Sequence, residues 1–391
     1  MKLLIVIPAL DEEDSIAAII ERCLVAREHI ITDSPVTAVD ITVVSDGSTD
    51  RTVELARRYA DRIRVIVFPE NRGYGAAIMA GWRESDADLL AFLDADGTCD
   101  PEAFAPLCSE LVATGADVMV GCRMNAESQM PLVRRIGNVM FAVLLSAVSS
   151  EKVRDVASGM RVVRRTSLPR LLPLPDRLHF TPAMSARAIL STELRLGEIE
   201  IPYHERAGHS KLRVGRDGLR FLQVIAQAAL LYRPFRPLAM AGIACGLVAA
   251  GLIARPTLYY LHNGSVAEWM IYRFVVSSLM ASSACLLLAA AYLTRKIVGI
   301  VLSERVRAVP PSLRAVAFVL VPAVLLVGGG ALVMPSFLEL VRSGSTYEHW
   351  SRFIAMSCLA SCALTLIVTG VFDYCLDLLQ ARVAYLKASD A

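Results

Sequence analysis

The stretch LLAFLDADG (residues 89–97) places two carboxylates directly after an apolar run. The run has the length of a buried strand, and open α/β sheets hold charged ligands where such strands end. Asp94 and Asp96 can share one divalent cation, because Mg²⁺ or Mn²⁺ held by one or two carboxylates completes its shell with phosphate oxygens. The pair therefore predicts a metal and a nucleotide diphosphate, and the alternative is an Asp-rich turn that caps a helix near Pro101.

Further short apolar runs are expected to be strands, at 3–7, 41–44, 63–67 and 118–120. They alternate with helical stretches, which is typical of a mostly parallel sheet with helices on both faces. Polar loops follow the first four strands, with the sequences PALDEE (8–13), SDGSTD (45–50), PENRGYG (69–75) and DADG (94–97). We expect these loops to meet at the carboxyl edge of the sheet, where a ligand crevice forms. Each loop taken alone also has a structural explanation, as a helix cap or a glycine turn.

The second half of the chain is more apolar than the first. Of the 391 residues 55% are hydrophobic, and long uncharged segments lie at 237–254, 274–294, 315–338 and 353–372. Each is close to the ~20 residues that cross a bilayer core. Four transmembrane helices are therefore expected, rather than the buried core helices of a large soluble protein.

The distribution of Lys and Arg predicts the orientation of these helices. Most basic residues of this half lie between the second and third segments or in the C-terminal tail: Arg295, Lys296, Arg305, Arg307, Arg314, Arg382 and Lys387. Because positively charged loops stay in the cytoplasm, both termini are expected there. The nine cysteines include no Cys-x-x-Cys pair and are expected to be reduced packing residues.

Together, the four loop motifs resemble those of glycosyltransferase family 2. The resemblance implies a GT-A fold, which is a Rossmann-like α/β domain with a mostly parallel sheet. It also implies an inverting sugar transferase that uses a nucleotide-diphosphate sugar with Mg²⁺ or Mn²⁺, the metal lying at Asp94 and Asp96. The donor would contact Pro8, Ala9, Asp11 or Glu13, Asp46, Gly73 and Asp94. Because no Gly-x-Gly-x-x-Gly follows the first strand and no P-loop lysine motif occurs, dinucleotide oxidoreductases and P-loop enzymes are not favoured.

Later segments resemble the polyprenyl-phosphate glycosyltransferases of this family, of which dolichol-phosphate mannose synthase is the best-known type. They are GCR (121–123), RRIGN (134–138), ASGMR (157–161) and ERAGHSKL (205–212). The resemblance implies that the lipid phosphate, or else the donor diphosphate, contacts Arg123, Arg134, Asn138, Ser210 and Lys211. It also implies that catalysis depends on Asp96, Arg123, Arg134 and Lys211. Two residues depart from the pattern: Thr98 stands where a Gln is common, and Asn138 where a Ser is common.

A lipid phosphate as the nucleophile explains why no general base stands out. Its second pKa is about 6, so it is largely a dianion at pH 7 and needs cations around it rather than a base. The expected reaction moves a hexose from a nucleotide sugar to a polyprenyl phosphate, dolichyl or undecaprenyl, at the cytoplasmic membrane face. The alternatives are another lipid or polysaccharide acceptor and, more remotely, a transporter or lipid-flipping module with a nucleotide-binding domain.

The expected domains are a catalytic domain at 1–212, an interfacial amphipathic helix and linker at 213–236, four transmembrane helices within 237–376 and a cytoplasmic tail at 377–391. In 213–236, apolar residues recur at helical spacing beside charged ones, which favours a helix in the membrane interface. The apolar stretch 139–148 fits either a membrane surface or an ordinary core helix. No nucleic-acid partner is expected, and the sequence leaves the sugar, the nucleoside and the oligomeric state open.

Overall fold

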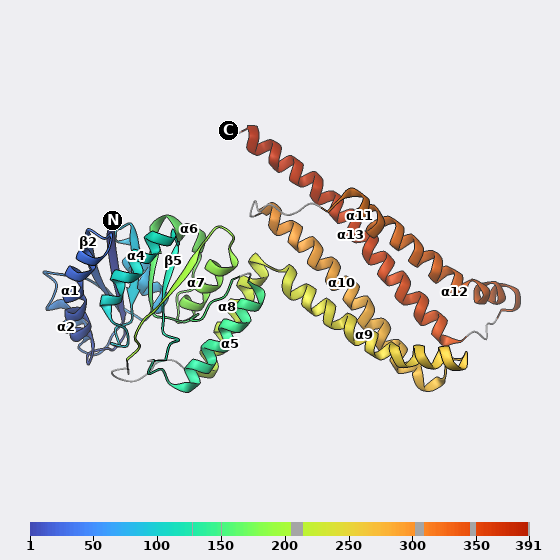
Figure 1. The fold of residues 1–391 in the computed structure, drawn as a ribbon, viewed down its shortest axis with the longest axis horizontal. Helices are drawn as coiled ribbons and strands as arrows, with labels where there is room; N and C mark the ends of the chain where they lie inside the picture. Colours follow the sequence, from blue (N-terminus) through green and yellow to red (C-terminus); the bar gives the residue numbers. More distant parts are fainter. Residues whose placement is uncertain (127, 150, 205–213, 302–308, 345–348, 390–391) are drawn as a thin grey trace. The chain divides into compact units, whose positions relative to one another are not determined.

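The computed structural model describes the chain except for residues 127, 150, 205–213, 302–308, 345–348 and 390–391 (Figure 1). The chain forms two compact units, Met1–Tyr232 and Arg233–Ala391.

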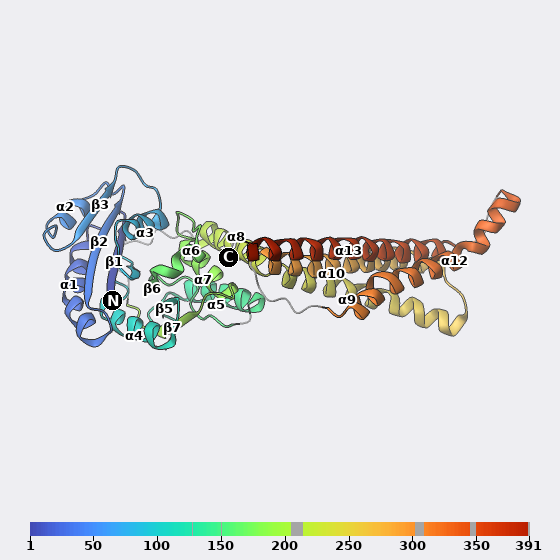
Figure 2. The same ribbon diagram turned by 90° about the horizontal axis from the view of Figure 1, so that it is seen from above.

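The first unit is built on a seven-stranded sheet with the order β3-β2-β1-β4-β6-β5-β7. Figure 2 shows β1, β2 and β3 side by side in this sheet. The strands are β1 (Lys2–Ala9), β2 (Ala38–Asp46), β3 (Arg64–Phe68), β4 (Leu89–Leu93), β5 (Val118–Cys122), β6 (Met160–Arg164) and β7 (Leu196–Glu200). The five strands expected from the sequence are confirmed. β6 runs antiparallel to β4 and β5, whereas the other pairs are parallel.

Helices pack on both faces of this sheet, as the alternating pattern predicts. The helices of this unit are α1 (Ile16–Asp33), α2 (Thr52–Arg57), α3 (Tyr74–Arg83), α4 (Phe104–Thr114), α5 (Leu132–Val148), α6 (Leu168–Leu171), α7 (Phe180–Leu190) and α8 (Val214–Tyr232), with short 3₁₀ turns η1 (Pro101–Ala103) and η2 (Arg165–Ser167). Successive strand residues point to opposite faces. Ile5 of β1 therefore packs in the core that includes α1 and α4, and Val6 packs in the core that includes α3 and α7.

A third apolar cluster joins α5, α7 and α8 in the same unit. Phe141 of α5 packs against Phe221 of α8, with their ring centroids 5.8 Å apart. The opposite face of α5 is exposed although it is apolar, with Leu132, Ile136 and Val143 at least 60% exposed. The stretch 139–148 therefore has one face that packs in a core and one face without a partner among the described residues.

The second unit consists of long helices, and four of them are long and apolar enough to cross a membrane. These spans are Phe235–Asn263, Glu268–Val301, Pro311–Ser343 and Trp350–Val383. Their elements are α9 (Phe235–Asn263), η3 (Glu268–Met270), α10 (Ile271–Val301), α11 (Pro311–Ala315), the π-helical turn η4 (Val316–Leu320), α12 (Val321–Ser343) and α13 (Trp350–Ser389). α10 packs against α9 and α13, and α12 packs against α13 (Figure 1).

Charged side chains link three helices of this unit. Lys296 of α10 and Arg314 of α11 both form ion pairs with Asp373 and Asp377 of α13. The hydroxyl of Tyr292 also donates to Asp373, at 2.8 Å. Two positive and two negative charges thus meet at one place, which compensates for the cost of removing each from water.

Candidate active site

A cavity of about 610 Å³ lies in the first unit at the carboxyl ends of β1, β2 and β4. Residues from the four polar loops line it together with residues of α5 and α8. The expectation that these loops meet at one sheet edge is confirmed. A ligand in this cavity would therefore touch both the loop residues and the two helices.

The two carboxylates that follow β4 line the cavity, and hydroxyl groups hold both of them. Asp94 Oδ1 accepts a hydrogen bond from the Tyr74 hydroxyl at 2.6 Å. Asp96 Oδ1 accepts from the Thr98 hydroxyl at 2.7 Å and from its backbone N–H at 3.2 Å. Thr98 stands where a Gln is common, and it is buried. Its two hydrogen bonds orient the Asp96 carboxylate.

The carboxylate pair fits a divalent cation that is shared with a ligand. Among the described residues, no group of three or more His, Cys, Asp or Glu side chains is placed to hold a metal ion. Asp94 and Asp96 could supply two oxygens, and a cation there would need phosphate or water oxygens to complete its shell. This arrangement matches a metal that binds together with a diphosphate.

The expected donor residues Pro8, Ala9, Asp46 and Gly73 all line the cavity. Asp46 accepts from the backbone N–H of Arg72 at 2.7 Å and from that of Gly73 at 2.9 Å. Burial nevertheless raises the pKa of Asp46, because it disfavours the charged carboxylate more than these bonds stabilise it. Gly73 has φ +115° and a Cβ there would lie 2.3 Å from Asp176 O, so this turn requires glycine.

The other two expected donor residues, Asp11 and Glu13, lie in the loop after β1 but outside the described lining of the cavity. Asp11 Oδ1 accepts from the Thr49 backbone N–H at 2.7 Å, and Glu13 Oε2 accepts from that of Arg51 at 3.1 Å. Both carboxylates therefore hold the β2–α2 loop in place. Glu12, between them, lines the cavity instead.

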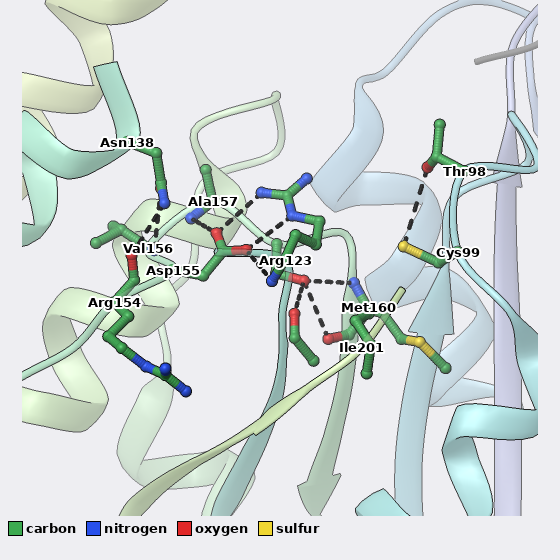
Figure 3. A network of polar contacts seen from close by, with 12 residues as sticks. Thr98, Cys99, Arg123, Asn138, Arg154, Asp155, Val156, Ala157, Met160 and Ile201 are labelled. Carbon is green, nitrogen blue, oxygen red and sulfur yellow. Dashed lines mark hydrogen bonds and ion pairs between the residues drawn. The ribbon is translucent and has the colours of Figure 1, made fainter. Parts of the chain in front are cut away.

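Arg123 lines the cavity in a buried ion pair with Asp155 (Figure 3). Its Nε lies 2.8 Å from Asp155 Oδ2 and its Nη2 lies 2.9 Å from Oδ1. Burial alone would raise the pKa of Asp155, but the charge and hydrogen bonds of Arg123 outweigh it and hold this pKa below its usual range. The pair fixes the Arg123 guanidinium in one orientation.

Asp155 was not predicted from the sequence, and it lies just before the segment ASGMR (157–161). A lone aspartate in a loop carries no signal of this role without its partner. Arg161 in that segment is buried and donates to the backbone carbonyls of Ser158 and Val156. Arg161 therefore braces the loop that carries Asp155, and burial lowers the pKa of its own guanidinium to about 10.

The other expected acceptor residues differ in their surroundings. Asn138 lines the cavity, but its amide donates to Arg154 O at 3.0 Å and accepts from Val156 N–H at 3.1 Å (Figure 3). It therefore holds the loop beside Asp155. Arg134 lines the cavity and is partly exposed. Ser210 and Lys211 lie outside the described residues.

Several residues of the lining were not predicted. Arg177 precedes α7, and Arg220 of α8 lies 3.5 Å from Asp217. The Tyr203 ring lies 5.4 Å from the Arg123 guanidinium. The packing of separate elements brings these residues to the cavity. The sequence around each of them therefore does not distinguish it from a surface residue.

Comparison with known proteins agrees with this geometry. Residues 4–172 match the model of glycosyl transferase family 2. The dolichyl-phosphate hexose transferase of Haloferax volcanii is 34% identical over 174 residues, which are 44% of this chain and 72% of that protein. The chain belongs to glycosyltransferase family 2. Its family and its mostly parallel sheet together confirm the expected GT-A fold.

Two more relatives match a larger share of this chain. The low-salt glycan biosynthesis hexosyltransferase Agl6 of Haloferax volcanii is 30% identical over 66% of this chain, and the chain spans 62% of that protein. The dodecaprenyl-phosphate galacturonate synthase of Rhizobium johnstonii is 27% identical, over 68% of this chain and 76% of that protein. The expected resemblance to polyprenyl-phosphate glycosyltransferases is confirmed by these relatives.

Among solved structures, glucosyl-3-phosphoglycerate synthase of Mycobacterium tuberculosis is similar, with a TM-score of 0.47 and 19% identity. The match covers 58% of this chain and 79% of that one. That enzyme was crystallised with Mn²⁺, uridine-diphosphate-glucose and phosphoglyceric acid.

Proposed function

We propose that this family 2 protein is an inverting glycosyltransferase that moves a hexose from a nucleotide-diphosphate sugar to a polyprenyl phosphate. The observation that carries the proposal is one cavity whose lining combines carboxylates, arginines and apolar side chains. Asp46, Asp94 and Asp96 line it together with Arg123 and Arg134, and with the apolar residues Val133 and Phe141 of α5. Relatives named for dolichyl and dodecaprenyl phosphate support this acceptor.

On this proposal, Asp94 and Asp96 hold Mg²⁺ or Mn²⁺. The cation supplies positive charge that stabilises the leaving diphosphate. Asp46 and the backbone around Gly73 form the nucleoside end of the donor site. Thr98 keeps the Asp96 carboxylate aimed at the cavity, because its hydroxyl bonds one of the two oxygens.

The acceptor phosphate attacks the anomeric carbon as a dianion, so the residues around it have to attract charge rather than remove a proton. Asp155 contacts Nε and Nη2 of Arg123, which leaves the Nη1 edge of the guanidinium to meet a phosphate. Arg134 supplies a second cation from α5. Contacts from Ser210 and Lys211 remain a prediction, since neither residue is described.

The exposed apolar faces of α5 and α8 suit a membrane surface. Leu132 of α5 is 70% exposed and Leu219 of α8 is 69% exposed, and more apolar side chains follow on the same helices. Large unpartnered apolar faces of this kind mark membrane or protein contacts. Since both helices also line the cavity, their insertion would bring the acceptor phosphate to the site while its prenyl chain stays in lipid.

The lipid product tests this function. The purified full chain in detergent is incubated with Mg²⁺, undecaprenyl phosphate and, in turn, uridine-, guanosine- and thymidine-diphosphate hexoses, and the lipids are analysed by mass. A hexosyl-phosphoryl lipid is expected with one donor class. Transfer to diacylglycerol or ceramide but not to undecaprenyl phosphate would overturn the proposed acceptor.

In the same assay, Arg134→Ala is expected to lower kcat/KM for undecaprenyl phosphate by about 10 to 150-fold. A charge-assisted phosphate contact contributes roughly 1.5 to 3 kcal/mol. Donor affinity, measured by calorimetry, should change only a few-fold. Arg135→Ala is the matched control, because Arg135 donates to Asn125 O and lies outside the described lining. Equal acceptor kinetics for both variants would exclude Arg134 from the phosphate site.

We further propose that the catalytic unit faces the cytoplasm, on the Lys and Arg distribution of the second half of the chain. An impermeant maleimide applied to intact cells should label Asn263→Cys but label Arg305→Cys only after permeabilisation. The unsubstituted chain measures the background from the native cysteines. The opposite labelling pattern would reverse the orientation.

A further inference from the structure

Tyr74 has a contact in the cavity that its sequence surroundings do not suggest. It is the first residue of α3, in the loop PENRGYG (69–75), where the motif draws attention to the glycines. Its hydroxyl donates to Asp94 Oδ1 at 2.6 Å. Tyr74 also lines the cavity, so the hydrogen bond lies at the edge of the candidate metal site.

The Tyr74 ring is held firmly, which makes the position of its hydroxyl well defined. It packs edge-on against Phe92 of β4 and Phe180 of α7, with ring centroids 6.2 Å and 6.5 Å away. Phe92 of β4 is fully buried and lies two residues before Asp94, which directly follows the strand. The hydroxyl and the carboxylate are therefore positioned by one continuous apolar core.

A second contact confines the other oxygen of Asp94. Leu93 of β4 pairs with Met160 of β6, which brings Gly159 beside the carboxylate. A Cβ on Gly159 would lie 1.9 Å from Asp94 Oδ2. The Asp94 carboxylate thus lies between a hydroxyl donor and a bare stretch of backbone, and both restrict its rotation.

We propose that Tyr74 is a positioning residue that fixes the Asp94 carboxylate for divalent-cation binding. This inference rests on the proposed metal role of Asp94 and Asp96. Without the hydroxyl, the carboxylate could rotate and would have to be ordered when the cation binds. Hydrogen-bond partners of metal ligands typically change metal affinity by about 10 to 100-fold when they are removed.

The test compares Mn²⁺ binding by the full chain and its variants in detergent, both without nucleotide and with a fixed concentration of the nucleoside diphosphate of the active donor class. Free Mn²⁺ is measured by electron paramagnetic resonance. Tyr74→Phe keeps the packed ring and should raise the Kd for Mn²⁺ about tenfold. Tyr59→Phe is the matched control, because it removes a hydroxyl that donates to Glu21 at 2.7 Å outside the described lining, and should change the Kd less than twofold.

Transfer kinetics separate positioning from damage to the fold. Tyr74→Phe should need about tenfold more Mn²⁺ for half-maximal rate and keep a kcat near that of the unsubstituted chain, whereas a misfolded site would lose kcat at every concentration. If Tyr74→Phe binds Mn²⁺ as the unsubstituted chain does while Asp96→Asn loses binding, the positioning role is wrong and the metal site stands. Mn²⁺ binding that is retained by Asp96→Asn would contradict both the positioning role of Tyr74 and the proposed metal site.

Discussion

Asp96→Asn is expected to lower the rate of hexose transfer by about 100-fold or more. The amide keeps the shape of the side chain and can still accept the Thr98 hydrogen bond, but it lacks the charge that anchors the cation. A group that stabilises developing charge from a preorganised position is typically worth this much in kcat. Asp94→Asn should be similar or somewhat milder.

The measurement is the initial rate of lipid glycosylation as Mg²⁺ or Mn²⁺ is titrated, with and without a chelator. Asp100→Asn is the control, because Asp100 caps the turn η1 through the Glu102 N–H and lies outside the described lining of the cavity. It should retain nearly full activity. Full turnover by Asp96→Asn in the presence of chelator would contradict the metal assignment.

Asp155→Asn is expected to destabilise the first unit by about 3 to 5 kcal/mol, because it leaves the Arg123 charge buried without compensation. The side chain of Asp155 is 0% exposed and that of Arg123 is 11% exposed. Loss of the carboxylate should also release the guanidinium from its fixed orientation and weaken acceptor binding. The loss of stability can be measured separately from the loss of acceptor binding if unfolding is followed without substrate.

Urea unfolding followed by tryptophan fluorescence measures this loss, since Trp82 is buried in the first unit. Glu200→Gln is the control, because its ion pair with Arg154 at 2.6 Å is exposed and such pairs contribute at most about 1 kcal/mol. An Asp155→Asn chain with an unchanged urea midpoint would show that the pair does not stabilise the fold.

The difference in stability between the unsubstituted chain and Asp155→Asn should depend on pH, and the direction of that dependence can be predicted. The pKa of Asp155 is lowered in the folded state. Its contribution to stability is therefore fully present above the ordinary carboxyl pKa of about 4, and is lost as the pH falls through the pKa of the folded state. The gap in stability between the unsubstituted chain and Asp155→Asn should therefore be constant near neutral pH. It should narrow only in acid.

Local pattern in the sequence was enough to predict much of this protein. Five strands, the polar loops at their ends and four long apolar helices follow from the spacing and composition of short segments, because burial of a strand or a membrane span depends on the residues within it. The antiparallel strand β6 and the edge strand β7 were missed. Their sequences, MRVVR and LGEIE, carry charges that interrupt the apolar pattern of a strand.

The motifs predicted which loops meet in the cavity and most of the residues that we expected to line it, but not which acidic residue of the first loop does so. In the first loop, where Asp11 has φ +46°, Glu12 lines the cavity, whereas Asp11 and Glu13 accept hydrogen bonds from the β2–α2 loop. The local sequence does not encode this choice, because it depends on how two loops pack. Asn138, likewise, could be recognised as a loop support only once residues 154–156 were seen beside it.

Contacts between distant segments were decided by the tertiary structure alone. Arg123 and Asp155 are 32 positions apart, and Tyr74 and Asp94 are 20 positions apart. Each pair forms because strand pairing and helix packing bring two loops to the same sheet edge. The sequence by itself determined the family, the carboxylate pair and the membrane spans, since those reside in contiguous residues. The partners that orient these groups were decided by the fold, because hydrogen bonds and buried charges depend on distances that only packing sets.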